Sequence, residues 1–371
     1  MKQSNTDLLF QPFSSDKLTL KNRVIMAPMT RNFSPNYIPG DDVVAYYQRR
    51  AENEVGLILT EGTTVNQISS NGYENVPAFH GDALDGWQKV VAAVHAAGGK
   101  IAPQLWHVGT VRRPGVGPDK DAPGIGPSGI SSKGKRKAKE MNDSEIADCI
   151  DAFAQGALDA KNLGFDAVEF HGAHGYLIDQ FFWEVTNERE DRYGGSIENR
   201  TRFAVDILQE ARRRVGEDFP FILRFSQWKQ QDYTAKLAQN PQELERFLGP
   251  LSDAGVDIFH ASTRRFWEPE FEGSSLNLAG WTKKITGKPS ITVGSVGLST
   301  DFIESNFLDQ SGNNVPLRQL DDLLNRMADG EFDLVAVGRA LLQDPEWLVK
   351  VKAGRWDALQ EYNKVSIGNL Y

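Results

Sequence analysis

The sequence predicts a single (β/α)8 barrel of the TIM type over residues 1–371, with an N-terminal hairpin and a long loop after the third strand. Eight short apolar segments, of the kind that forms buried parallel strands, alternate with helical segments along the chain. Polar residues gather where several of these strands end, as they do at the active-site face of such barrels. A doubly wound sheet is the alternative, but no Gly-x-Gly-x-x-Gly follows the first strand.

The composition narrows the class of protein. Hydrophobic residues make up 40% of the chain and charged residues 25%, which is typical of a soluble globular protein, and the net charge of −9 argues against binding nucleic acid. Cys149 is the only cysteine, so the chain forms no intramolecular disulfide and cannot hold an iron–sulfur cluster. The first residues have no apolar signal-peptide core, and no apolar run approaches about 18 residues. We therefore expect a cytoplasmic protein that does not interact with membranes.

The N-terminal hairpin is predicted from two short apolar patches between Leu8 and Arg23, on either side of Ser14-Ser15-Asp16. It would cover the bottom of the barrel. After it, apolar and β-branched segments bounded by turn residues predict the strands. The eight expected strands are 24–26, 57–60, 100–105, 167–170, 221–225, 257–261, 290–293 and 334–337.

Helix-capping residues support the predicted helices. Asn142 stands three positions before Glu145, which is the spacing of a capping box. Ser196 can cap the helix that it precedes, and Gly98-Gly99 ends the helix before the third strand. The expected helices are 41–53, 84–97, 143–163, 196–215, 242–254, a short one at 279–286, 317–328 and 345–351.

The loop after the third strand runs from Leu105 to Met141 and is rich in proline and glycine. Loops of this length in compact domains are usually functional lids or flexible tails. On a barrel, this one would lie over the strand ends.

The fourth strand carries the densest chemistry of the sequence. His171, His174 and Tyr176 follow its apolar part within six positions and are separated by Gly172 and Gly175. The glycines allow a sharp turn and a close approach to a ligand. Two imidazoles and a phenol offer hydrogen-bond donors and a proton. We therefore expect an active site at this strand end.

Two further features indicate an anionic cofactor. Glycine turns follow the seventh and eighth strands at Gly294-Ser295 and Gly338-Arg339, where such barrels often bind phosphate. Arg224 lies inside an apolar strand, and a buried cation needs an anionic or acceptor partner. That partner is either a core carboxylate such as Glu169 or a cofactor ring.

Several motifs spread over residues 8–348 resemble the old yellow enzyme family of FMN-dependent ene-reductases. They are Asn22-Arg-Val-Ile-Met-Ala-Pro-Met-Thr-Arg31, Thr60-Glu-Gly62, Pro103-Gln-Leu-Trp-His-Val-Gly109, Phe170-His-Gly-Ala-His-Gly-Tyr-Leu177, Asp191-Arg-Tyr-Gly-Gly-Ser-Ile-Glu-Asn-Arg200 and Val337-Gly-Arg-Ala-Leu341. The chain departs from the branch with Cys at position 30, where it has Thr. The segment from Arg264 to Phe271 matches no family pattern.

The resemblance implies roles for individual residues around a tightly but non-covalently bound FMN. Thr30 and Gln104 would bind the flavin C4 carbonyl and the pyrimidine edge, and Arg224 would face N1 and the C2 carbonyl. His171 and His174 would clamp the substrate oxygen. Tyr176 would be the proton donor, and Trp106 would shape the substrate pocket. Pro28, Met29 and Gly62 would line the flavin ring, and Gly294, Ser295, Gly338 and Arg339 would hold the phosphate.

The implied reaction is a ping-pong reduction of activated alkenes, that is, α,β-unsaturated carbonyl or nitro compounds. NADPH or NADH would reduce FMN and leave, and flavin N5 would then transfer hydride to the alkene while Tyr176 protonates it. The partners would be these small molecules, and the protein would be a monomer or a homodimer.

Two alternatives to this function remain at the level of sequence. A metal-dependent barrel hydrolase could use His107, His171, His174 and His260, although the first and eighth strands supply no ligand. The basic run from Lys133 to Lys139 could contact nucleic acid or attract NADPH phosphates, or could be a solvated loop.

Overall fold

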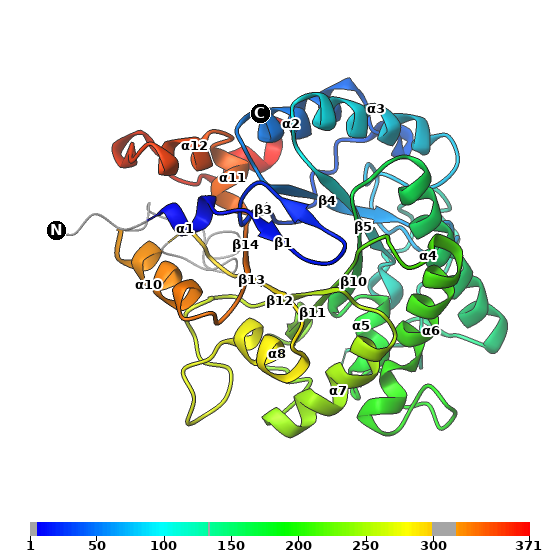
Figure 1. The fold of residues 1–371 in the computed structure, drawn as a ribbon. Coiled ribbons are helices and arrows are strands. Elements are labelled where there is room, and N and C mark those ends of the chain that lie inside the picture. Colours follow the sequence, from blue (N-terminus) through cyan, green and yellow to red (C-terminus); the bar gives the residue numbers. More distant parts are fainter. Residues whose placement is uncertain (1–5, 133, 299–316) are drawn as a thin grey trace.

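The computed structural model describes residues 6–132, 134–298 and 317–371. In this part of the chain, eight parallel strands close into a barrel in which each strand pairs with the next along the chain and the last pairs with the first (Figure 1). The predicted barrel is therefore confirmed. Its strands are β3 (Val24–Met26), β4 (Leu57–Thr64), β5 (Ile101–Trp106), β10 (Val168–His174), β11 (Phe221–Lys229), β12 (Ile258–Ser262), β13 (Ser290–Val293) and β14 (Leu334–Val337).

Three strands run four residues further than the sequence predicted. β4, β10 and β11 end at Thr64, His174 and Lys229, beyond the predicted ends at 60, 170 and 225. The prediction stopped where polar residues begin. In a barrel, however, polar side chains at the carboxyl end of a strand can face the site while the backbone remains paired. His171 and His174 therefore lie on the fourth strand itself.

Helices surround the barrel (Figure 1), and each predicted helix is present within two residues of its expected bounds. The Asn142 capping box and the Ser196 cap both form. The helices are α2 (Asp41–Glu52), α3 (Ala83–Ala96), α4 (Asp143–Asn162), α6 (Ile197–Val215), α7 (Pro241–Asp253), α8 (Leu278–Thr286), α10 (Leu317–Ala328) and α12 (Trp347–Lys352).

Short helices were missed because so few residues show no periodicity. α5 (Leu177–Phe182) follows β10 directly, and α11 (Arg339–Gln343) follows β14. The others are α1 (Asp7–Phe10) and the single turns η1 (Pro35–Tyr37), η2 (Gly109–Val111), η3 (Trp356–Ala358) and η4 (Lys364–Gly368). Among the described residues, no helix combines the length and the apolar character needed to cross a membrane.

The N-terminal hairpin closes the bottom of the barrel, as predicted. Its strands β1 (Phe13–Ser14) and β2 (Thr19–Leu20) pair antiparallel. Phe13, Leu18 and Leu20 are buried in one apolar cluster with inward-facing residues of the barrel strands, such as Ile222 and Ile258. In Figure 1 the hairpin, in dark blue, lies across the near end of the barrel. The opposite end, at the carboxyl ends of the strands, remains for the site.

The long loop after β5 is ordered by internal hydrogen bonds. It contains two small sheets, β6 (Ile125–Gly126) with β9 (Lys139–Glu140) and β7 (Ile130–Ser132) with β8 (Lys135–Arg136). The buried guanidinium of Arg112 donates to the carbonyls of Val116, Asp119 and Ala122 and so holds the loop together. Within the basic run, Lys133 lies outside the described residues. Arg136 forms an ion pair with Glu188 and Lys139 forms one with Glu145, so acidic neighbours already satisfy part of this charge.

Candidate active site

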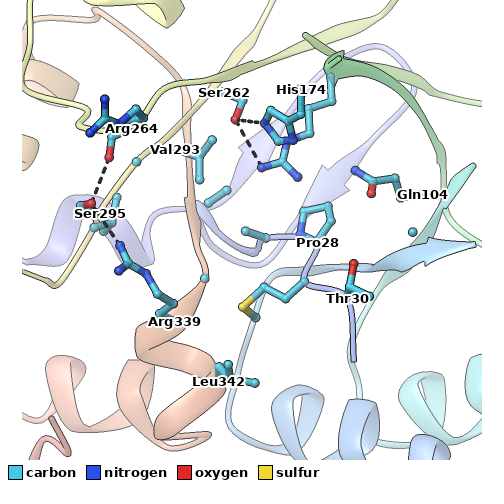
Figure 2. A pocket seen from close by; sticks show the side chains of 18 of the residues that line it. Pro28, Thr30, Gln104, His174, Ser262, Arg264, Val293, Ser295, Arg339 and Leu342 are labelled. Carbon is cyan, nitrogen blue, oxygen red and sulfur yellow. Dashed lines mark hydrogen bonds between the residues drawn. The ribbon is translucent and has the colours of Figure 1, made fainter. Parts of the chain in front are cut away.

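The carboxyl ends of the barrel strands enclose a cavity of about 830 Å³. Every site residue singled out from the sequence lines it. These residues are Pro28, Met29, Thr30, Gly62, Gln104, Trp106, His171, His174, Tyr176, Arg224, Gly294, Ser295, Gly338 and Arg339. In Figure 2, Thr30 and Gln104 lie on one side of the cavity and Ser295 and Arg339 on the other.

The two histidines and the tyrosine converge. The ring centroids of His171 and His174 lie 5.2 Å apart, and those of His171 and Tyr176 lie 5.1 Å apart. Trp106 stacks on His171 at 6.1 Å and meets the edge of Tyr176 at 4.8 Å, so the indole fixes both rings. The Tyr176 hydroxyl donates a long hydrogen bond of 3.4 Å to Gln230. The phenol, both imidazoles and the indole therefore form one wall of the cavity.

The backbone between these side chains adopts an unusual conformation. His174 and Gly175 have φ of 65° and 80°, in the left-handed region. For a residue with a side chain this region costs about 1–2 kcal/mol, so neighbouring contacts must hold His174 there. A side chain at position 175 would also place its Cβ 1.9 Å from Gln231 Oε1. Glycine is therefore favoured where the turn redirects the chain from β10 into α5.

Burial sets the protonation states of His171, His174 and Tyr176. It lowers the pKa of His171 and His174 well below the usual value, and the charge on Arg224 lowers both further. Burial also raises the pKa of Tyr176 well above its usual value. At neutral pH both imidazoles are therefore uncharged, while Tyr176 keeps its proton and can act as an acid but not as a base.

Arg224 projects into the cavity from β11. Its Nη2 donates to the Ser262 hydroxyl at 3.5 Å, and its buried Nε has no hydrogen-bond partner among the described residues. Ser262 also bonds His174 Nε2 at 2.8 Å, as the dashed line in Figure 2 shows. A buried guanidinium with an unused donor fits an acceptor-rich ligand in the cavity.

Glu169 is not an ion-pair partner of Arg224 in the described structure. Its carboxylate instead accepts from Gln104 Nε2 at 2.7 Å and bonds His260 Nδ1 at 2.6 Å. Glu169 therefore holds the Gln104 amide in one orientation. Glu169 thus makes no direct ion pair with Arg224, although burial lowers the pKa of Arg224 and the charge on Glu169 partly opposes that larger effect.

The end of the cavity that is lined by Gly294, Ser295 and Arg339 can bind an anion. Gly294, with φ of 147°, lets the backbone pass close to Thr263, because a Cβ there would lie 2.7 Å from the Thr263 carbonyl oxygen. Arg339 Nη2 donates to the Ser295 hydroxyl at 3.2 Å, and this hydroxyl donates to the Arg264 carbonyl (Figure 2). An arginine beside a glycine turn suits a phosphate. Together with Arg224 in mid-cavity, this end matches a phosphorylated planar cofactor.

Several cavity residues were missed from the sequence. Trp228 stacks on His174 with centroids 4.5 Å apart, and Gln230 accepts from Tyr176. Both belong to β11 or directly follow it, beyond the predicted strand end, and the polar run from Ser226 to Gln231 is a signal that could have located them. Also missed were Ser262, which ends β12, and Thr263 and Arg264, which follow it.

A second missed group comes from the end of the sequence. Tyr362, Lys364, Val365, Ile367 and Gly368 line the cavity opposite the strand ends. Arg31, just after β3, holds this segment by donating from Nη2 to the carbonyls of residues 366, 367 and 369 at 3.2, 3.1 and 2.5 Å. No local pattern reports such a long-range contact.

The histidines proposed for a metal site do not converge. His107 Nε2 bonds Gln67 at 3.0 Å and its Nδ1 accepts from the Gly109 amide, while His260 bonds Glu169. In the described ranges, no group of three or more His, Cys, Asp or Glu residues is arranged to hold a metal ion. The structure thus gives the hydrolase alternative no support.

Comparisons with known proteins agree with this geometry. Residues 8–306 match the model of the NADH:flavin oxidoreductase / NADH oxidase family. An NADH oxidase of Thermoanaerobacter brockii is 32% identical over 97% of this chain, which spans 53% of that relative's length. An NADPH dehydrogenase of Halalkalibacterium halodurans is 32% identical over 91% of this chain and 92% of its own. The structure of morphinone reductase in complex with tetrahydroNAD is 29% identical, covers 97% of this chain and 93% of its own, and has a TM-score of 0.79.

Proposed function

The chain belongs to the NADH:flavin oxidoreductase / NADH oxidase family, the old yellow enzyme family of FMN-dependent NAD(P)H oxidoreductases, and from this premise we propose that it reduces activated carbon–carbon double bonds. The substrates would be α,β-unsaturated carbonyl or nitro compounds. The observation that carries the proposal is the convergence of two neutral imidazoles and a protonated phenol on one cavity. The similarity to morphinone reductase also supports a reductase of oxo compounds.

The residues of the cavity fit FMN. Gly294, Ser295, Gly338 and Arg339 would hold the phosphate, and the unused donor of Arg224 would meet the pyrimidine ring. Gln104 would bind the same ring through its amide, which Glu169 orients. The remaining contacts with the flavin would come from Pro28, Met29, Thr30 and Gly62. When bound, FMN supplies hydride chemistry, since it takes a hydride from NAD(P)H and passes one to the β-carbon of the alkene.

The chain's own residues would prepare the alkene and complete its reduction. His171 and His174 would donate hydrogen bonds to the carbonyl or nitro oxygen, which stabilises the negative charge that builds up there. To do so, His174 would exchange its hydrogen bond to Ser262 for one to the substrate. Tyr176 would deliver its hydroxyl proton to the α-carbon. Trp106, which stacks on His171, would pack against the substrate on the same side.

A steady-state assay tests this function. NADPH and NADH would each be offered with a panel of enones, nitroalkenes and nitrate esters under exclusion of oxygen, and the products would be identified by mass as saturated compounds from the alkenes or as alcohols, with nitrite, from the nitrate esters. Because donor and acceptor would use the same cavity, we expect parallel lines in double-reciprocal plots. An FMN-loaded protein that oxidises NAD(P)H only when oxygen is present, and saturates none of the alkenes, would refute the proposal.

The phosphate contact gives a separate prediction. Arg339→Ala should weaken FMN binding by about tenfold or more, because a charge-assisted hydrogen bond contributes roughly 1.5–3 kcal/mol. Binding of riboflavin, which lacks the phosphate, should change little. Fluorescence titration of the apoprotein measures both affinities.

The matched control is Arg213→Ala, which removes an exposed arginine from α6, on the outside of the barrel. It should leave both affinities unchanged. Equal losses of FMN and riboflavin affinity in the Arg339 variant would show that Arg339 supports the cavity in general and not the phosphate.

A further inference from the structure

Two charged residues that the proposed mechanism does not use lie directly behind the His174 turn. We propose that Asp179 and Lys229 are positioning residues, whose buried ion pair fixes the turn that presents both His174 and Tyr176 to the cavity. This inference rests on the proposed function, because it assumes that these two side chains act on the substrate.

The pair is fully enclosed. The side chains of Asp179 and Lys229 are each 0% exposed, and the ammonium lies 2.5 Å from Asp179 Oδ1. Lys229 Nζ also donates to the Ser226 carbonyl at 3.0 Å. Burial raises the pKa of Asp179 and lowers that of Lys229, since neither charge has water around it. The two groups therefore depend on each other and on nearby backbone.

Asp179 joins the pair to the turn. Its Oδ2 accepts from the Gly175 amide at 2.7 Å, and it stands on α5, the helix that begins immediately after Tyr176. Tyr176 occupies the N-cap position of this helix, so the position of α5 sets where the phenol starts from the backbone. The same carboxylate thus ties together the left-handed Gly175, the helix start and Lys229.

Lys229 joins the pair to β11. It is the last residue of that strand and lies in register with His174 of β10. The next amide, of Gln230, donates to the His174 carbonyl at 3.2 Å, and the His174 amide donates to the Ser226 hydroxyl at 3.0 Å. The end of β11 therefore holds both backbone polar groups of His174.

These contacts hold the turn in its strained conformation. His174 and Gly175 both have positive φ, a conformation that persists only where the surroundings enforce it. A buried ion pair adds little net stability to a fold, but losing one member leaves an uncompensated charge. The role of this ion pair is therefore to hold the turn in position. Without it, α5 and the end of β11 can shift relative to each other, which moves His174 away from Tyr176.

The test uses purified, FMN-loaded protein and the variants Asp179→Asn and Lys229→Met. The control is Asp257→Asn, at the opposite end of the barrel, where Asp257 pairs with two cations, Lys17 and Arg212, and accepts from a backbone amide, that of Phe221. The readouts are the dissociation constant of para-chlorophenol, from the long-wavelength band expected for a phenolate over the flavin, the FMN affinity and the melting temperature.

We expect both site variants to raise the dissociation constant of the phenol about tenfold or more, because misplacement by about 1 Å is costly in such sites. FMN affinity should be retained. The control should lower the melting temperature but leave phenol binding unchanged. If either variant does not fold with FMN, the double variant Asp179→Asn/Lys229→Met, which leaves no unpaired charge, should show the same loss. Wild-type phenol affinity in any folded variant overturns the proposal.

A further variant separates this inference from the proposed function. His171→Ala/His174→Ala should abolish the phenol band. If it does, while the Asp179 and Lys229 variants bind phenol normally, only the positioning role fails. If the band survives without either histidine, the clamp assignment itself fails, and the positioning role fails with it.

Discussion

Replacing Tyr176 by phenylalanine should slow oxidation of the reduced enzyme by an enone roughly 10²-fold or more, the usual share of general acid catalysis. Reduction of the enzyme by NAD(P)H should be nearly unchanged, because the hydroxyl is assigned only to protonating the alkene. Its proton is available throughout the neutral range, since burial raises the pKa of Tyr176. Stopped-flow absorbance of the flavin measures the two half-reactions separately.

A nitroalkene should suffer less from the loss of the Tyr176 hydroxyl, because its nitronate product can leave and take its proton from water. Tyr193→Phe is the control for losing a buried hydroxyl elsewhere, since the Tyr193 hydroxyl bonds Asp206 at 2.9 Å outside the cavity. Equal slowing of both half-reactions in Tyr176→Phe would mean that the hydroxyl supports the cavity without donating the proton.

Removing both imidazoles should have an effect of similar or greater size. In His171→Ala/His174→Ala we expect enone reduction to fall by about 10²–10³-fold, as when oxyanion-stabilising donors are deleted from other enzymes. FMN should remain bound, because its expected contacts are with other residues, among them Arg224 and Arg339. The phenol band should disappear, and the oxidative half-reaction should slow by the same factor.

His95→Ala serves as a control for the double variant, since His95 lies on α3 and pairs with Asp166 at 3.0 Å, at the barrel exterior. A double variant that reduces enones at the wild-type rate would exclude the histidines as the oxygen clamp. A variant that loses FMN as well would instead indicate a collapse of the cavity, and single replacements by asparagine, which keeps a donor, would then resolve the two effects.

Barrel architecture could be predicted from the sequence because strand and helix signals repeat eight times and each is local. The site residues on the predicted strands could be predicted as well, since the carboxyl ends of parallel strands meet at one face. Gln104 and Arg224 are apt examples, because each is a polar residue within an otherwise apolar segment. Because a polar side chain buried in an apolar strand needs a partner, the sequence alone indicates that each contacts another polar group inside the protein.

What the sequence did not reveal depends on tertiary contacts. The Glu169 carboxylate bonds Gln104 on the neighbouring strand β5 and His260 on β12, which is two strands away on the other side, and no spacing reports that choice. The left-handed His174 could not be predicted, because its conformation is imposed by contacts with α5 and β11. Trp228 was missed for a simpler reason, since the strand was ended too early.

The anchoring of residues 366–369 by Arg31 has a consequence for the order in which the protein is made. Barrel closure needs β14 to pair with β3, so it cannot precede synthesis of residue 337. The segment at residues 366–369 is made later still, because the carbonyls that accept from Arg31 lie 335 to 338 positions after it in the chain. Contacts so distant in sequence form slowly. A chain clipped near residue 360 would lack Tyr362 and the residues after it that line the cavity, so the cavity would be open on that side.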